Sequence, residues 1–111
     1  MAELTVNGVV IATDKEGYLK QLEDWSEPVA EAIAAEEGIK LVDEHWELIN
    51  AIRQFYQEFG LSPAMRPLVK FVKQQLGADK GNSLYLLKHF PDSPAKRLSK
   101  IAGLPRPENC L

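Results

Sequence analysis

The sequence has almost no cysteine and no long apolar run. Cys110 is the single cysteine among 111 residues, which excludes an intramolecular disulfide and a thiolate-based zinc site. No apolar stretch approaches the ~18 residues that a membrane span requires. The first residues lack both the basic and the apolar segment of a signal peptide. We therefore expect a cytoplasmic protein with no membrane anchor, no metal and no organic cofactor.

Histidine is also scarce, and its spacing does not fit a metal site. His45 and His89 lie far apart, without further ligand types at the usual intervals. We expect His45 to cap or pack against a helix. The aromatic residues Trp25, Trp46 and Tyr56 stand in helical patterns, which favours core packing for them.

The charges are divided unevenly between the two halves. Residues 1–61 carry four basic and thirteen acidic groups, whereas residues 62–106 carry nine basic and two acidic ones. Two interpretations stay open. The basic half could form a face for an acidic partner such as RNA, or the two halves could neutralise each other across the fold.

The pattern of residues predicts a mainly α-helical protein with one small hairpin. Two β-prone runs flank Asn7-Gly8, which is typical of a type I′ hairpin over about residues 4–11. A polar turn at 14–17 and a short helical segment at 18–22 should follow. Serine, asparagine, proline and glycine at the boundaries then indicate further helices. The first begins after the cap Ser26, the second near Asp43, and the fourth after Asn82-Ser83. The third begins at Ser62-Pro63 and the fifth at Ser93-Pro94, each with the serine as N-cap and the proline as the first helical residue. The expected architecture is a compact bundle of about five helices.

The last eight residues differ from the rest. Residues 104–111 contain two prolines and no helical period, so we expect a flexible, extended arm following a helical domain of residues 1–103. Eight extended residues span on the order of 25 Å. Cys110 would then stand near the tip of an arm able to enter another protein's pocket.

A lone cysteine on such an arm suits the carriage of sulfur as a persulfide. The thiolate is the reactive form, and Lys100 and Arg106 are nearby cations that could lower the thiol pKa. Glu108 and the carboxylate of Leu111 oppose them, so the direction of the shift stays open. Without a nearby histidine, the pattern does not indicate a hydrolytic triad.

The tail residues 100–107 (Lys-Ile-Ala-Gly-Leu-Pro-Arg-Pro), followed by Cys110, resemble the TusE/DsrC family of sulfur-relay proteins. The segments 44–46, 53–56 and 63–68 add to the resemblance. It implies a helical bundle with a hairpin and a mobile arm. It also implies a sulfurtransferase activity in which Cys110 forms the cysteine persulfide.

The resemblance further implies partners. TusE-like proteins take sulfur from the TusBCD complex, through its TusD subunit, and pass it to the tRNA thiolase MnmA for 2-thiolation of the wobble uridine. The DsrC branch has a second arm cysteine, and the equivalent residue here is Ser99. The one-cysteine pattern is therefore similar to TusE.

Two alternatives remain. The chain could be a DsrC-like partner of a dissimilatory sulfite reductase, although Ser99 cannot form that branch's disulfide. It could also be a helix-turn-helix nucleic-acid-binding module, with helices at 62–76 and 83–89 and an incidental Cys110.

Overall fold

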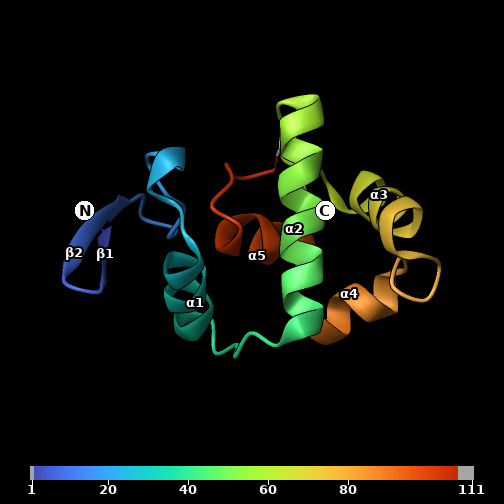
Figure 1. Ribbon diagram of the computed structural model, residues 1–111, viewed down its shortest axis with the longest axis horizontal. Coiled ribbons are helices and arrows are strands. Elements are labelled where there is room, and N and C mark those ends of the chain that lie inside the picture. Colours follow the sequence, from blue (N-terminus) through green and yellow to red (C-terminus); the bar gives the residue numbers. More distant parts are fainter. Residues whose placement is uncertain (1, 108–111) are drawn as a thin grey trace.

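The computed structural model describes residues 2–107, and this part of the chain confirms the predicted fold class. Five α-helices follow a two-stranded antiparallel sheet and one short 3-10 helix (Figure 1). The elements are β1 (Ala2–Val6), β2 (Val9–Thr13), η1 (Leu22–Asp24), α1 (Glu27–Glu36), α2 (Asp43–Phe59), α3 (Met65–Leu76), α4 (Ser83–His89) and α5 (Pro94–Ile101).

The hairpin forms at the predicted place. Val6 pairs with Val9 around Asn7-Gly8, and both turn residues have positive φ angles, 51° and 82°, as a type I′ turn requires. One face of the ribbon carries the cross-strand pair Leu4 and Ile11, which are both buried. The hairpin contacts α1, which supplies the apolar partner that an isolated hairpin lacks.

The segment after the hairpin differs from the prediction of a short helix at 18–22. The polar turn at 14–17 does form, because Asp14 accepts hydrogen bonds from the backbone N–H groups of Glu16 and Tyr18. It returns the chain alongside β2, where Leu19 forms an antiparallel bridge with Thr13. Only Leu22–Asp24, which form η1, become helical.

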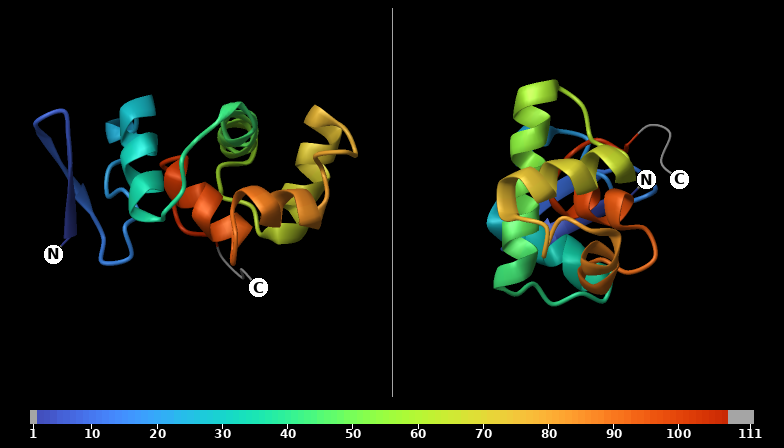
Figure 2. Two further views of the ribbon diagram at one scale, coloured as in Figure 1. Left: turned by 90° about the horizontal axis from the view of Figure 1, so that it is seen from below. Right: turned by 90° about the vertical axis from the view of Figure 1, so that its right-hand side faces the viewer.

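Helix α5 occupies the centre of the molecule. It contacts α1, α2, α3 and α4, and Figure 1 shows it between α1 and α2, while Figure 2 gives the same arrangement from two other sides. Leu98, Ile101 and Ala102 are fully buried in the core. The described chain measures 40 × 26 × 22 Å, with the hairpin and α1 towards one end and α3 and α4 towards the other (Figures 1 and 2).

Most predicted helix boundaries are confirmed. The Ser26 hydroxyl accepts a hydrogen bond from Val29 N–H at the start of α1, Asn82 caps α4 in the same way, and Gly60 ends α2 with a left-handed conformation. The prediction that Ser62-Pro63 begins a helix is wrong, because α3 starts at Met65. With that start Pro67 is the third helical residue, where a missing N–H leaves no hydrogen bond unmade.

His45 takes the structural place expected for it. Its Nδ1 accepts a hydrogen bond from Val42 N–H at the start of α2, and its Nε2 lies 3.0 Å from the carbonyl oxygen of His89. Among residues 2–107, no three histidine, cysteine or acidic side chains gather as a metal-binding group. No helix in the same range is long and apolar enough to span a bilayer.

Candidate functional site

The end of α5 determines how the chain enters its last segment. The N–H of Gly103 donates to the carbonyl oxygen of Lys100, and that of Leu104 donates to the carbonyl oxygen of Ser99. This pair of bonds is a Schellman motif, which needs a left-handed residue, and Gly103 supplies it with a φ of 75°. The buried side chain of Leu104 adds the apolar contact that commonly accompanies such a helix end.

Two side chains from outside α5 bind its last carbonyl groups. Trp25 Nε1 donates to the oxygen of Ile101 over 2.9 Å, and Arg53 Nη1 donates to the oxygen of Ala102 over 2.7 Å. The Arg53 guanidinium also stacks on the Trp25 ring, 3.8 Å from the ring centre. A cation at a helix C-terminus is favoured by the helix dipole, so this pair stabilises the point where the chain leaves α5.

Gly103 and Trp25 approach each other too closely for a side chain. A Cβ atom added to Gly103 would lie 2.3 Å from Cδ1 of Trp25, far inside van der Waals contact. The glycine is therefore required both for its positive φ and for the space that Trp25 occupies. We call Trp25, Arg53, Ala102 and Gly103 the tail anchor.

The residues after the tail anchor are also held against the body. The Ser62 hydroxyl donates to the carbonyl oxygen of Pro105, Arg106 forms an ion pair with Glu16, and Pro107 is buried. The sequence predicted an extended arm over 104–111. Its first four residues pack against the body, so any free segment would begin after Pro107. Cys110 and the mobility predicted for it lie outside the described residues.

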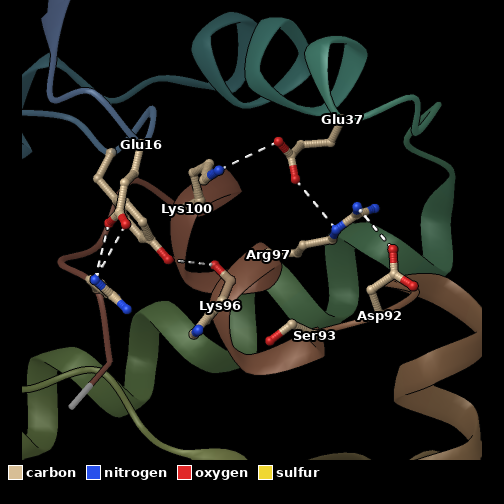
Figure 3. A pocket seen from close by; sticks show the side chains of 9 residues that line it. Glu16, Glu37, Asp92, Ser93, Lys96, Arg97 and Lys100 are labelled. Carbon is tan, nitrogen blue, oxygen red and sulfur yellow. Dashed lines mark hydrogen bonds and ion pairs between the residues drawn. The ribbon is translucent and has the colours of Figure 1, made fainter. Parts of the chain in front are cut away.

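The two cations predicted to assist Cys110 share one surface groove. Lys100 and Arg106 line a cavity of about 430 Å³ along α5, together with Glu16, Tyr18, Glu37, Asp92, Ser93, Lys96 and Arg97 (Figure 3). We call it the α5 groove. It combines side chains from the turn after β2, the end of α1 and the last helix, which are far apart in sequence.

Both predicted cations are already paired with carboxylates. Lys100 Nζ lies 3.4 Å from Glu37, whose other oxygen accepts from Arg97 at 3.3 Å. Arg106 pairs with Glu16 at 3.2 Å, and both of these side chains are about half exposed. An exposed ion pair is easily exchanged for another. Arg106 is thus the more available cation, whereas Lys100 is held within the body.

The ion pairs answer part of the question raised by the uneven charges. Four of the five salt bridges in the described chain join an acidic residue of the first half to a basic residue of the second, namely Glu47–Lys80, Glu37–Arg97, Glu37–Lys100 and Glu16–Arg106. The two halves therefore neutralise each other at these places. The cations of α3 take no part in any of the five.

A second groove lies on the other side of the tail segment. It measures about 490 Å³ and is lined by Tyr56, Gly60, Leu61, Ser62, Pro63, Ala64, Pro67, Pro105 and Arg106. We call it the proline groove. Arg106 lines both grooves. The last described residues therefore run between the charged α5 groove and the largely apolar proline groove.

Ser99, which the resemblance in sequence implied to be the counterpart of a second arm cysteine, is enclosed in the core. Its side chain is completely buried and its Oγ has no hydrogen-bond partner in the described chain. A hydroxyl in this setting cannot supply the thiol that a disulfide needs. The surroundings are those of an apolar side chain.

The sequence did not indicate Trp25, Arg53, Glu37 and Ser62 as parts of this site. Arg53 belongs to one of the segments that resemble the family, but its position on α2 gave no sign of a contact 49 residues away. Gly103 and the two prolines Pro105 and Pro107 were the only local signal. They indicated that the helix ends and that a non-helical segment follows, but they did not indicate which residues this segment contacts.

Comparison with known proteins places this geometry in a family. The family model described as "DsrC like protein" matches residues 5–111. The sulfurtransferase TusE homolog of Haemophilus influenzae is 54% identical over 97% of this chain and 99% of its own length. The sulfurtransferase TusE of Escherichia coli is 53% identical with the same coverage.

Solved structures agree with the fold. DsrC of Allochromatium vinosum has a TM-score of 0.90 and 45% identity, with both chains covered completely. The oxidized gamma-subunit of the dissimilatory sulfite reductase (DsrC) of Archaeoglobus fulgidus has a TM-score of 0.85 and 39% identity, covering 99% of this chain and all of that one. These relationships confirm the predicted resemblance and sulfurtransferase activity, and the chain belongs to the DsrC-like protein family.

Proposed function

We propose that Cys110 carries sulfur as a persulfide from a donor protein to a tRNA thiolase. Identity above 50% to sulfurtransferases named TusE, over nearly the whole chain, is the observation that carries this proposal. The donor is a TusBCD-like complex acting through its TusD subunit. The acceptor is an MnmA-like thiolase that modifies the wobble uridine of bound tRNA, and such an acceptor places the reaction in the cytoplasm.

The transfer needs only thiol chemistry. The Cys110 thiolate attacks the outer sulfur of the donor persulfide, an S–S bond forms at Cys110, and the S–S bond of the donor breaks to release the donor thiolate. The persulfide on Cys110 then gives its outer sulfur to an acceptor thiolate in the same manner. Each step exchanges one thiolate for another, so neither an external oxidant nor a reductant enters.

The contacts of residues 105–107 with the body support this role by limiting how far the carrier can reach. Cys110 follows Pro107 by three residues, and three residues span at most about 11 Å. Donor and acceptor must therefore bring their reactive sulfur close to the α5 and proline grooves. Because the segment before Cys110 is held in place, the Cys110 sulfur can take only a limited range of positions, which favours productive alignment with the partner's sulfur.

Arg106 is the cation that we propose to assist the sulfur. It stands four residues before Cys110, and its pair with Glu16 is exposed enough to be given up when a partner docks. A guanidinium near a thiolate or persulfide stabilises the anion and favours the deprotonated form. Lys100, held by Glu37, is proposed to keep the groove positively charged while remaining in place.

The test is transfer of labelled sulfur. Wild-type protein, Cys110→Ser and Arg106→Gln are incubated with a loaded TusBCD-like donor, and the mass of each intact protein is measured before and after treatment with a reductant. We expect one added, reducible sulfur on the wild type, none on Cys110→Ser and slower loading of Arg106→Gln. Onward transfer is followed as labelled sulfur in tRNA after a thiolase is added. A wild-type protein that never gains sulfur from a competent donor would refute the proposal.

The reductase alternative is less well supported. The Archaeoglobus fulgidus relative is the gamma-subunit of a dissimilatory sulfite reductase, but it shares 39% identity with this chain, against 54% for the TusE homolog. The buried Ser99 also removes the second arm thiol of that branch. A single-cysteine carrier matches the residues of this chain better than a two-cysteine one.

A further inference from the structure

The outer face of α3 carries a row of cations with no acidic counterpart. Arg66, Lys70 and Lys73 are exposed, and α3 contains no acidic residue. Within residues 2–107, none of the three forms a salt bridge or a side-chain hydrogen bond, whereas other cations of the second half do. We call these three residues the α3 ridge.

The spacing places the three side chains on one line. At 3.6 residues per turn, Arg66, Lys70 and Lys73 lie within about 60° of one another around the helix axis, and their Cα atoms are separated along it by about 6 and 4.5 Å. The buried residues Leu68 and Val72 lie on the opposite side and fix α3 to the core. The ridge therefore lies on the side of α3 that is turned away from the core, and Gly81 packs against the backbone at its Lys73 end.

This arrangement is electrostatically unfavourable for the isolated protein. Like charges three and four residues apart repel each other on a helix. Arg66 is the second residue of α3, near the positive end of the helix dipole, where an acidic side chain would be stabilising. A bound polyanion would relieve both effects.

The ridge also lies at the end of the molecule opposite to the acidic helix α1 (Figures 1 and 2). Helix α1 carries Glu27, Glu31 and Glu36, all exposed, and it stands near one end of the longest axis while α3 stands near the other (Figures 1 and 2). A polyanion approaching the protein would thus be oriented towards α3.

We propose that the α3 ridge contacts the phosphate backbone of RNA, and this proposal rests on the tRNA acceptor proposed above. The chemistry of the ridge favours RNA over an acidic protein surface. The other exposed residues of α3 include Pro67, Gln74 and Gln75, so α3 itself offers hydrogen-bond donors and no exposed aromatic side chain. The exposed Phe59 beside Phe71 belongs to α2. Stable protein interfaces concentrate aromatic and aliphatic anchors and are poor in lysine, whereas lysine and arginine side chains form much of the contact with phosphates.

The test compares two variants of equal charge. One carries Arg66→Gln, Lys70→Gln and Lys73→Gln. The control carries Lys15→Gln, Lys20→Gln and Lys40→Gln, which removes three other exposed cations without described ion pairs. Binding of each protein to a fluorescently labelled tRNA transcript with a wobble uridine is measured by anisotropy at several salt concentrations. Labelled poly-L-glutamate serves as a polyanion without phosphate or ribose.

We expect the ridge variant to bind tRNA roughly tenfold or more weakly, and its slope of log affinity against log salt to fall by about two to three. The control should bind nearly as the wild type does. Equal losses in both variants, no binding of tRNA by the wild type, or an equal loss of poly-L-glutamate binding by the ridge variant would each overturn the assignment to RNA. Sulfur loading of Cys110 is measured separately in both variants. It reports on the proposed carrier function alone and should be unchanged.

Discussion

The guanidinium of Arg53 lies 3.8 Å above the ring of Trp25, and the two side chains donate to successive carbonyl oxygens at the end of α5. Arg53 comes from α2 and Trp25 from the segment before α1, so the contact joins three distant parts of the chain. It secures the last turn of α5 immediately before the segment that leads to Cys110. The tail anchor thus links the stability of the fold to the placement of the carrier residue.

Removing the Arg53 guanidinium should destabilise the protein measurably. Arg53→Gln loses the charge-assisted hydrogen bond to Ala102 and the stacking on Trp25, and we expect the free energy of unfolding to fall by about 2 kcal/mol. Trp25→Phe keeps an aromatic ring but loses the bond to Ile101, and should cost about 1 kcal/mol. Urea denaturation gives both values. Arg66→Gln, which removes an exposed and unpaired cation, is the control and should change little.

Gly103→Ala should be more damaging than an ordinary glycine replacement. The new Cβ would meet Trp25 at 2.3 Å, and the residue would also have to keep a positive φ. Gly38→Ala is a matched control, because Gly38 has a φ of 76° but no atom within 4 Å of the added carbon. We expect about 1 kcal/mol of destabilisation at Gly38 and about 3 kcal/mol at Gly103.

Thermal or urea unfolding of the two glycine variants gives the comparison directly. Equal destabilisation of both would mean that the Trp25 side chain moves aside at little cost in free energy. The tail anchor would then stabilise the fold less than its contacts indicate. Labelled-sulfur transfer in Gly103→Ala, measured where the protein is folded, adds a second readout. A displaced tail segment should slow the transfer.

Two buried serines should respond in opposite directions to the same substitution. Ser62 donates to the carbonyl oxygen of Pro105, whereas Ser99 Oγ has no partner. Ser62→Ala leaves a carbonyl oxygen without its donor and should cost about 1 kcal/mol, while Ser99→Ala removes an unsatisfied hydroxyl and should stabilise by about 1 kcal/mol. Denaturant midpoints at constant slope measure both effects. A loss of stability in Ser99→Ala would show that its hydroxyl makes a bond in solution.

The predictions from sequence succeeded where local chemistry determines the structure. Asn7-Gly8 requires a tight turn, and Ser26 and Asn82 cap their helices, because each of these signals acts within a few residues. The start of α3 was misplaced because Ser62-Pro63 looks like a helix start. Pro67, however, would then be the fifth helical residue and would break a backbone hydrogen bond.

The candidate site was harder to predict because its contacts join distant segments. Leu19 returns to pair with Thr13, and Ser62 reaches Pro105 across 43 residues. Neither contact leaves a pattern in the local sequence. The prolines of the tail indicated a segment without regular secondary structure, which residues 104–107 are, but the packing of these residues depends on side chains that only the tertiary structure brings there.

The final prediction concerns pH and depends on His45. Its Nδ1 accepts from Val42 N–H, so Nε2 carries the proton and donates to the oxygen of His89 in the neutral ring. Burial lowers the pKa of His45 below the ordinary value of 6.5, and this effect outweighs the hydrogen bond to the His89 carbonyl oxygen, which acts in the opposite direction. Above pH 6.5 both folded and unfolded states hold the neutral ring, and the full stability is present. As the pH falls below 6.5, the unfolded state takes up the proton first, so stability declines until the folded pKa is passed.

His45→Gln tests this directly, because a glutamine can accept from Val42 through its oxygen and donate to His89 through its nitrogen without titrating. Urea denaturation at about pH 7.5 and about pH 5.5 should show a loss of stability in the wild type that is smaller in the variant. The difference between the two proteins isolates the imidazole from the carboxylates, which titrate at lower pH. An identical pH dependence in both would contradict the assigned tautomer and its role as a helix cap.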